Sequence, residues 1–174
     1  MTDLFEGQLM SRITCMSCKF HSATFDNFMD LSIEIPRKAV RILGSISLQE
    51  CLKTFFTLEK MIDSGYKCES CKKAVNIEKD ISIYQFPRIL TIHLKRFYHS
   101  SMRREKISSA VQIPENLSMG SFAPNSKHES VKQANYKLYG VSHHSGSLYG
   151  GHYICEVQNV TTGRWYRCND SHVN

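Results

Sequence analysis

Alternating apolar and polar residues run through most of the sequence and predict a protein built mainly from β-strands. A period of two is typical of half-buried strands, and it recurs in Thr24–Ile35, Ile77–Phe86, Ile89–Phe97, Tyr136–Ser142 and Tyr153–Val157. Two stretches have the composition of loops, His99–Ser109 and Pro124–Gln133. Because turns rather than crossover helices separate the strands, we expect a mainly antiparallel sheet.

One helix is predicted after Ser47. The segment Ser47-Leu48-Gln49-Glu50 is a capping box, in which the serine oxygen accepts from the backbone N–H of Glu50 and the Glu50 side chain returns to the backbone N–H of Ser47. An apolar stripe follows at helical spacing, formed by Leu48, Cys51, Leu52, Phe55 and Phe56. The pattern as a whole therefore predicts an α+β fold.

Length and composition fit one globular domain or a part of one, since the chain has 174 residues, 41% apolar and 22% charged. We see no segment that resembles a signal peptide and no apolar run of membrane-spanning length, so we expect no membrane association and a reducing compartment, cytoplasmic or nuclear. The net charge of +6 is mild and spread along the chain. We interpret the basic run Arg103, Arg104 and Lys106 as a solvated loop, with contact to acidic or carbonyl-rich substrate surface as the alternative.

Two CxxC pairs are the strongest chemical signal. They are Cys15–Cys18 and Cys68–Cys71, and residues 19–67 separate them. Each spacing lets two thiolates converge on one tetrahedral ion from a tight turn, so the four cysteines predict one structural zinc ion that joins two distant hairpins. Two coincidental reduced pairs are the alternative. A redox motif is disfavoured because neither pair opens a helix after a parallel strand.

The other three cysteines are predicted to act as small hydrophobic residues. Cys51 falls in the helical stripe, whereas Cys155 and Cys168 fall in strand-like sequence.

The segment Gly150-Gly151-His152-Tyr153 follows a predicted mobile loop, Ser142–Tyr149. If Asn159–Thr162 forms the turn of the next hairpin, His152 lies directly opposite Asn169, on one face of the sheet. An asparagine oxygen there accepts from the imidazole and aims its other nitrogen outward.

This is the base and orienter part of a catalytic triad. Two alternatives stay open: His152 caps a strand while Asn169 and Asp170 open a turn, or the register slips by one residue. The same register places Cys155 opposite Tyr166. Cys155 and Cys168 then point through the other face, so no cysteine here is a convincing nucleophile.

Taken together, the blocks of this sequence resemble the catalytic domain of ubiquitin-specific proteases (USPs). The resemblance extends over nearly the whole chain and rests on Leu4–Leu9, the two CxxC pairs, Phe25–Ser32, Leu48–Phe56, Phe86–Leu90, His93–Phe97, Tyr136–Val141, Gly150–Tyr153 and Trp165–Ser171. It implies a papain-like cysteine protease fold, present in part as a β-rich palm and zinc-bound fingers over residues 1–174.

The resemblance also implies a deubiquitinating cysteine protease that hydrolyses the (iso)peptide bond after the C-terminal glycine of ubiquitin. His152 would be the general base, Asn169 its orienter and Asp170 a helper, while Cys15, Cys18, Cys68 and Cys71 would bind the zinc.

The family's thumb with its cysteine box, and its final strand, have no counterpart in this sequence, so we expect a fragment without its nucleophile that is inactive alone. The alternative is a catalytically inactive, zinc-containing module that binds ubiquitin. A zinc-dependent nucleic-acid binder is disfavoured because no basic helix accompanies the cysteines.

Overall fold

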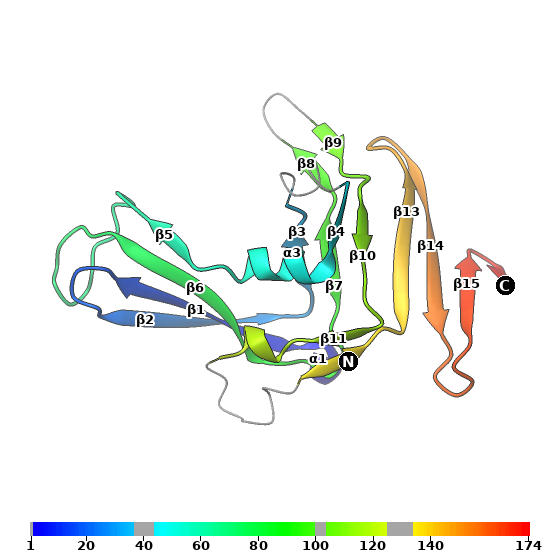
Figure 1. Ribbon diagram of the computed structural model, residues 1–174, viewed down its shortest axis with the longest axis horizontal. Coiled ribbons are helices and arrows are strands. Elements are labelled where there is room, and N and C mark those ends of the chain that lie inside the picture. Colours follow the sequence, from blue (N-terminus) through cyan, green and yellow to red (C-terminus); the bar gives the residue numbers. More distant parts are fainter. Residues whose placement is uncertain (1, 37–43, 100–103, 125–133) are drawn as a thin grey trace.

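A computed structural model describes residues 2–36, 44–99, 104–124 and 134–174 (Figure 1). Its helical elements are α1 (Thr2–Phe5), α3 (Leu48–Phe55) and the 3-10 turn η1 (Gly120–Phe122). Its strands are β1 (Gly7–Cys15), β2 (His21–Phe28), β3 (Leu31–Glu34), β4 (Ser45–Ser47), β5 (Glu59–Met61), β6 (Ile77–Gln85), β7 (Ile92–Lys95), β8 (Phe97–His99), β9 (Arg104–Lys106), β10 (Ala110–Gln112), β11 (Asn116–Ser118), β12 (Asn135–Lys137), β13 (Gly140–Gly146), β14 (Gly151–Gln158), β15 (Trp165–Asn169) and β16 (His172–Val173). This composition confirms the strand-rich α+β prediction.

Among the described strands most pairs are antiparallel, as expected, but two pairs are parallel. These are β3 with β7 and β4 with β10. Parallel neighbours need a long crossover connection, and each of these pairs joins segments far apart in the sequence. The alternation of residues within a strand carries no information on such pairing, which explains why the sequence did not predict it.

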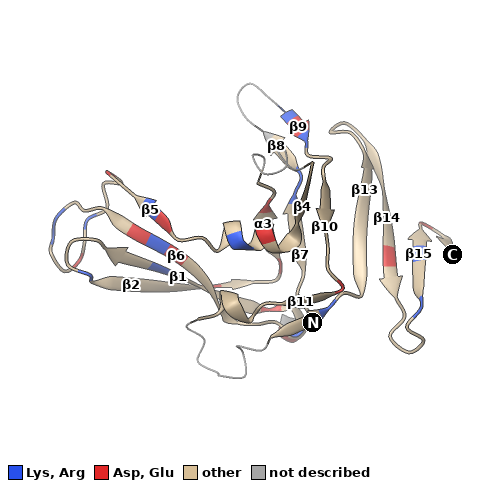
Figure 2. Cartoon of the chain, in the orientation of Figure 1, with Lys and Arg blue, Asp and Glu red and all other residues tan. Residues whose placement is uncertain are grey.

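A four-stranded antiparallel sheet in the order β2-β1-β6-β5, here called the cysteine sheet, extends to one side of the molecule (Figure 1). Strand β1 is an inner strand that pairs with β2 on one side and with β6 on the other, where the β1–β6 register shifts between Gln8 and Leu9. The Arg12 guanidinium contacts the Asp80 carboxylate directly opposite it at 3.0 and 3.2 Å. Positive and negative residues lie side by side on β5 and β6 (Figure 2). Charges of both signs are therefore mixed on these two strands.

Helix α3 anchors the core. Its predicted capping box is present: the Glu50 N–H donates to Ser47 Oγ at 3.2 Å, and the Ser47 N–H donates to Glu50 Oε2 at 3.0 Å. The buried face of the helix packs into the core cluster, whose fully or nearly buried members are Leu31, Ile33, Ile35, Ile46, Leu48, Cys51, Leu52, Ile83, Leu117, Met119 and Ala123. Phe55 and Phe56, at the end of the predicted stripe, are partly buried beside it.

A second four-stranded antiparallel sheet, β13-β14-β15-β16, is here called the histidine sheet. It lies at the end of the molecule away from the tip of the cysteine sheet (Figure 1). The predicted loop Ser142–Tyr149 is wrong over most of its length, because β13 continues to Gly146 and pairs with β14 as far as Gly151. The polar side chains suggested a loop, but the backbone hydrogen bonds of a strand do not depend on them.

Other boundaries also differ from the sequence expectation. The predicted strand Thr24–Ile35 is divided into β2 and β3 at Asp30, whose carboxylate accepts from Ser32 Oγ at 3.0 Å. Within the predicted loop His99–Ser109, Arg104–Lys106 forms β9 and pairs with β8. The remaining predicted loop, Pro124–Gln133, lies outside the described residues from position 125 onwards.

No helix in the described part of the chain combines the length and apolar character that a membrane crossing requires.

The packing of α3 makes a quantitative prediction. Leu52 is completely buried in the core cluster, so Leu52→Ala should lower the free energy of unfolding by about 2–5 kcal/mol. The adjacent, exposed Lys53 is the matched control, and Lys53→Ala should change it by about 0.5 kcal/mol or less. Urea denaturation measures both variants, and equal effects would contradict the assigned helix face.

Candidate functional site

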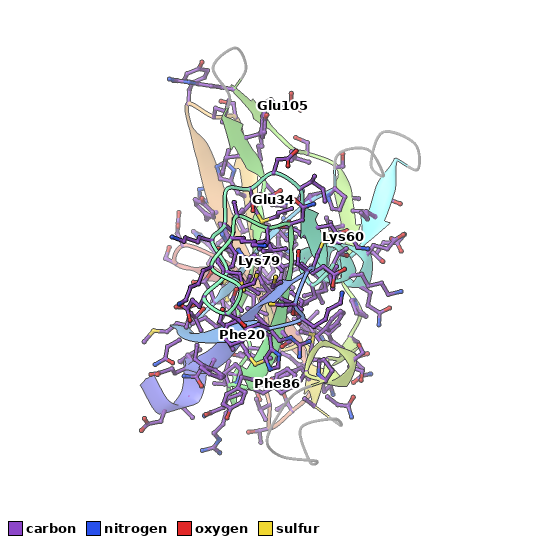
Figure 3. The ribbon with its side chains drawn as sticks, turned by 90° about the vertical axis from the view of Figure 1, so that its left-hand side faces the viewer. Phe20, Glu34, Lys60, Lys79, Phe86 and Glu105 are labelled. Carbon is purple, nitrogen blue, oxygen red and sulfur yellow. The ribbon has the colours of Figure 1, made fainter. Side chains whose placement is uncertain are left out.

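Four cysteines meet at the tip of the cysteine sheet, the end that faces the viewer in Figure 3. Cys15 ends β1 and Cys18 lies in the β1–β2 turn, while Cys68 and Cys71 lie in the connection between β5 and β6. The sulfur atoms all lie within 4.8 Å of one another. Two of the separations are 3.9 Å, from Cys15 to Cys71, and 3.6 Å, from Cys18 to Cys68.

The two CxxC segments fold into turns of the same form. In the first, the Cys15 N–H donates to Phe20 O at 2.8 Å and the Lys19 N–H donates to Cys15 O at 3.0 Å. In the second, the Cys68 N–H donates to Lys73 O and the Lys72 N–H to Cys68 O, at 3.0 and 2.9 Å. The residue after each second cysteine has a positive φ, 61° at Lys19 and 57° at Lys72. Each turn thereby directs its two thiols to the same side.

Backbone groups in these turns favour the thiolate form of the first cysteine of each pair. The Cys18 N–H points at Cys15 Sγ at 3.4 Å, and this contact, assisted by the Ser17 N–H, lowers the pKa of Cys15 to about 6. The Cys71 N–H lowers the pKa of Cys68 in the same way. Burial and then the neighbouring thiols raise the pKa of Cys71 to about 12. A cation bound among these sulfur atoms would favour the thiolate form of all four cysteines.

This donor set fits zinc. A regular tetrahedron with Zn–S bonds of about 2.3 Å has sulfur–sulfur edges of about 3.8 Å, close to the two separations given above. The prediction that Cys15, Cys18, Cys68 and Cys71 form one cluster is confirmed, and the cluster could hold a metal ion.

A histidine–asparagine pair lies on the histidine sheet. His152, the second residue of β14, contacts Asn169 at the end of β15, with 2.5 Å between His152 Nε2 and Asn169 Oδ1. An amide oxygen can only accept, so the Nε2 nitrogen carries the hydrogen and the lone pair of the neutral ring is on Nδ1. Both side chains belong to exposed residues. The arrangement presents a basic, oriented nitrogen to the surface.

The two residues meet although the predicted register was wrong by two residues. Cys155 lies opposite Cys168 rather than Tyr166. The loop is longer than predicted: Asn159 Oδ1 accepts from the N–H groups of Thr161 and Thr162, and the Asn159 N–H donates to Arg164 O at 2.8 Å. A shift by two keeps every side chain on its face, so His152 contacts Asn169 diagonally.

Asp170 follows Asn169 in the turn between β15 and β16. Its φ of 50° is in the left-handed region, which aspartate tolerates better than most residues. Its proposed role as helper stays a prediction.

Residues behind this pair were not predicted from the sequence. His144 lies on β13 opposite Tyr153, with 4.7 Å between ring centroids, and its ring makes an edge-type contact with Phe97 at a centroid distance of 5.6 Å. A Cβ added to Gly151 would overlap His144 Nε2 and the backbone oxygen of Ser145. The imidazole of His144 therefore fills the place of a side chain at position 151, directly before His152.

Lys106 also supports this hairpin. Its ammonium group donates to the backbone oxygens of His144 and Gly146, both at 2.9 Å, and the residue is half-buried. The interpretation of the basic run as a solvated loop is therefore wrong for Lys106. Arg104 is exposed, as that interpretation predicted, and Arg103 lies outside the described residues. A lone lysine in a polar segment gives no sequence signal for such a contact.

The seven cysteines all belong to the described residues, and four of them form the cluster. Cys51 is completely buried in the core, where burial raises the pKa of its thiol. Cys155 and Cys168 are half-buried, and strand alternation directs their side chains to the face opposite His152 and Asn169. The described residues thus provide an oriented base on one sheet and a cluster of four thiols suited to a metal on the other. None of the seven cysteines lies beside the base.

These features describe a β-rich protein in which one sheet ends in a four-cysteine cluster and a second sheet carries a histidine–asparagine pair. A family model described as "Ubiquitin carboxyl-terminal hydrolase" matches residues 1–174. The chain belongs to this family.

Curated relatives carry the same family name. Ubiquitin carboxyl-terminal hydrolase 2 of Gallus gallus is 40% identical over 176 residues, which cover 99% of this chain and 47% of the relative. Ubiquitin carboxyl-terminal hydrolase 2 of Homo sapiens is 39% identical, with 98% and 27% covered. Human ubiquitin carboxyl-terminal hydrolase 21 is 38% identical, with 100% and 30% covered. The chain thus spans less than half of the length of each of these relatives.

Solved structures agree on the fold. A SAGA DUB module that contains Ubp8 and is bound to monoubiquitin aligns with a TM-score of 0.85 at 32% identity, over 99% of this chain and 37% of that one. A module of the same name bound to ubiquitin aldehyde gives a TM-score of 0.83 at 31% identity, with the same coverage. The fold expected from the resemblance is confirmed.

The packing around Gly151 yields a matched pair of variants. Because a Cβ at position 151 overlaps His144 and Ser145, Gly151→Ala should lower the free energy of unfolding by about 1–3 kcal/mol. A Cβ at the neighbouring Gly150 has no atom within 4 Å, so Gly150→Ala should have an effect of about 0.5 kcal/mol or less. Chemical denaturation of the two variants measures the difference, and equal stability would show that His144 does not occupy this space.

Proposed function

We propose that this chain is the fingers and palm part of a cysteine-type deubiquitinase, which hydrolyses the (iso)peptide bond after the C-terminal glycine of ubiquitin. The contact between His152 Nε2 and Asn169 Oδ1 carries the proposal, in a chain whose relatives are named ubiquitin carboxyl-terminal hydrolases. The solved neighbours bound to monoubiquitin and to ubiquitin aldehyde support ubiquitin as the partner.

In this mechanism His152 is the general base. Its Nδ1 accepts the proton of a cysteine thiol, while Asn169 holds the Nε2–H and stabilises the orientation of the imidazolium that forms. The thiolate attacks the carbonyl carbon of the terminal glycine, His152 returns the proton to the leaving amine, and water then hydrolyses the thioester. Asp170, one residue beyond Asn169, would contribute its charge without contacting the ring.

The nucleophile comes from a segment outside these 174 residues. The positions of the seven cysteines support this, since four form the metal cluster, one is buried in the core and two point away from His152. The relatives, which are more than twice as long as the matched region, have room for such a segment.

Zinc is the metal we assign to the cysteine cluster. Bound there, it would supply a structural cross-link between the β1–β2 turn and the connection before β6, and it would take no part in the chemistry. A site that needs four free thiolates suits a reducing compartment, the cytoplasm or the nucleus.

Metal analysis tests the zinc assignment. The purified chain should contain one zinc ion, and Cys15→Ser or Cys68→Ser should lose most of it, because three thiolates bind zinc far more weakly than four. Cys155→Ser, outside the cluster, is the control and should retain the metal. A wild-type chain that contains no zinc, or a Cys15→Ser variant with full occupancy, would contradict the assignment.

Kinetics on the full-length protein test the catalytic assignment. With a fluorogenic ubiquitin substrate, His152→Ala should lower kcat by about 10²–10⁴-fold and change KM little. The matched control is His21→Ala, at an exposed histidine on β2, which should leave kcat unchanged. Asn169→Ala should lower kcat more than Asp170→Asn does, because Asn169 contacts the imidazole ring.

The 174-residue chain alone should bind ubiquitin without turnover. Binding without turnover by the full-length protein as well would favour the inactive ubiquitin-binding module.

A further inference from the structure

Two cysteines that the proposed chemistry does not use lie directly opposite each other. Cys155 on β14 and Cys168 on β15 are register partners in an antiparallel pair, so their side chains share one face of the histidine sheet. Both are half-buried and free. Burial raises the pKa of the Cys168 thiol, and the nearby Cys155 thiol raises it further.

The backbone separation suits a disulfide. Opposite residues of an antiparallel pair have Cα atoms about 4.5 or 5.5 Å apart, and disulfides connect Cα atoms about 4.4–6.8 Å apart. The four cysteines of the metal cluster, which could otherwise exchange with this pair, lie at the tip of the cysteine sheet, at the other end of the molecule (Figure 1). Cys51 is enclosed in the core.

The face that carries the pair is open to small molecules. On β14 the residues before and after Cys155 on this face are Tyr153 and Val157, which are 62% and 36% exposed. A hydroperoxide can therefore reach a half-buried thiol between them. His152 and Asn169 lie on the opposite face.

We propose that Cys155 and Cys168 form a site of reversible oxidation, which closes a disulfide across β14 and β15 and covalently joins the two strands that carry His152 and Asn169. The inference does not depend on the proposed enzymatic activity, because it concerns only these two thiols.

A hydroperoxide is the oxidant. The Cys155 thiolate attacks the peroxide O–O bond, which breaks to give a sulfenic acid on Cys155 and one molecule of alcohol or water. The Cys168 thiol then attacks the sulfenic sulfur, the S–S bond forms, and water leaves with the hydroxyl group and the thiol proton. The two sulfur atoms together lose two electrons and the peroxide gains them.

Peptide mapping tests this directly on the zinc-loaded chain. After brief treatment with hydrogen peroxide, thiol blocking and trypsin digestion without reductant, we expect peptide 138–164 linked to the peptide that begins at Cys168. Dithiothreitol should separate them. Unfolding the chain in urea before adding peroxide should greatly reduce the yield of this link, since the register of the folded sheet creates it.

Single substitutions provide the controls. Cys155→Ser and Cys168→Ser should each abolish the link, and Cys168→Ser should leave a sulfenic acid on Cys155, detected as a dimedone adduct. Cys51→Ala should retain the link. The proposal is overturned if the folded wild-type chain gives no linked peptide, or if dimedone labels Cys155 and Cys168 independently at full yield.

Discussion

The pairing of β1 with a strand on each side is the constraint on which the cysteine sheet depends. Because β1 hydrogen-bonds to β2 along one edge and to β6 along the other, the two turns that carry cysteines end at the same tip. A slip of two residues in either pairing would move a thiol by about 7 Å, and the tetrahedral cluster would be lost. The Arg12–Asp80 contact across β1 and β6 favours the observed register.

The histidine sheet depends on a weaker constraint, the parity of its register. His152 and Asn169 share a face in any register that differs from the observed one by an even number of residues. The observed hairpin shows this, since its loop is longer than expected and the two side chains still meet. Their exact contact depends on Asn159, whose side chain holds the long loop by accepting two backbone hydrogen bonds.

Features that depend on the spacing of residues close together in the sequence could be predicted. The CxxC pairs gave the thiol cluster, the capping box gave the start of α3, and residue alternation gave the face of His152. Features that depend on distant contacts could not be predicted. The parallel pairs join segments with no local signal, and Lys106 reaches backbone oxygens of β13 that only the folded chain brings near. His144 looked like a loop residue, yet it packs in the space that Gly151 leaves empty.

In the proposed deubiquitinase the two sheets have separate roles. The cysteine sheet provides a cluster of four thiols that could hold a metal ion, and the histidine sheet provides the oriented base for a thiol from another segment. Covalent capture tests this account most directly. The full-length protein should react with ubiquitin that carries a C-terminal electrophile, and peptide mapping should locate the adduct on a cysteine outside the seven described here. An adduct on Cys51, Cys155 or Cys168 would contradict the account.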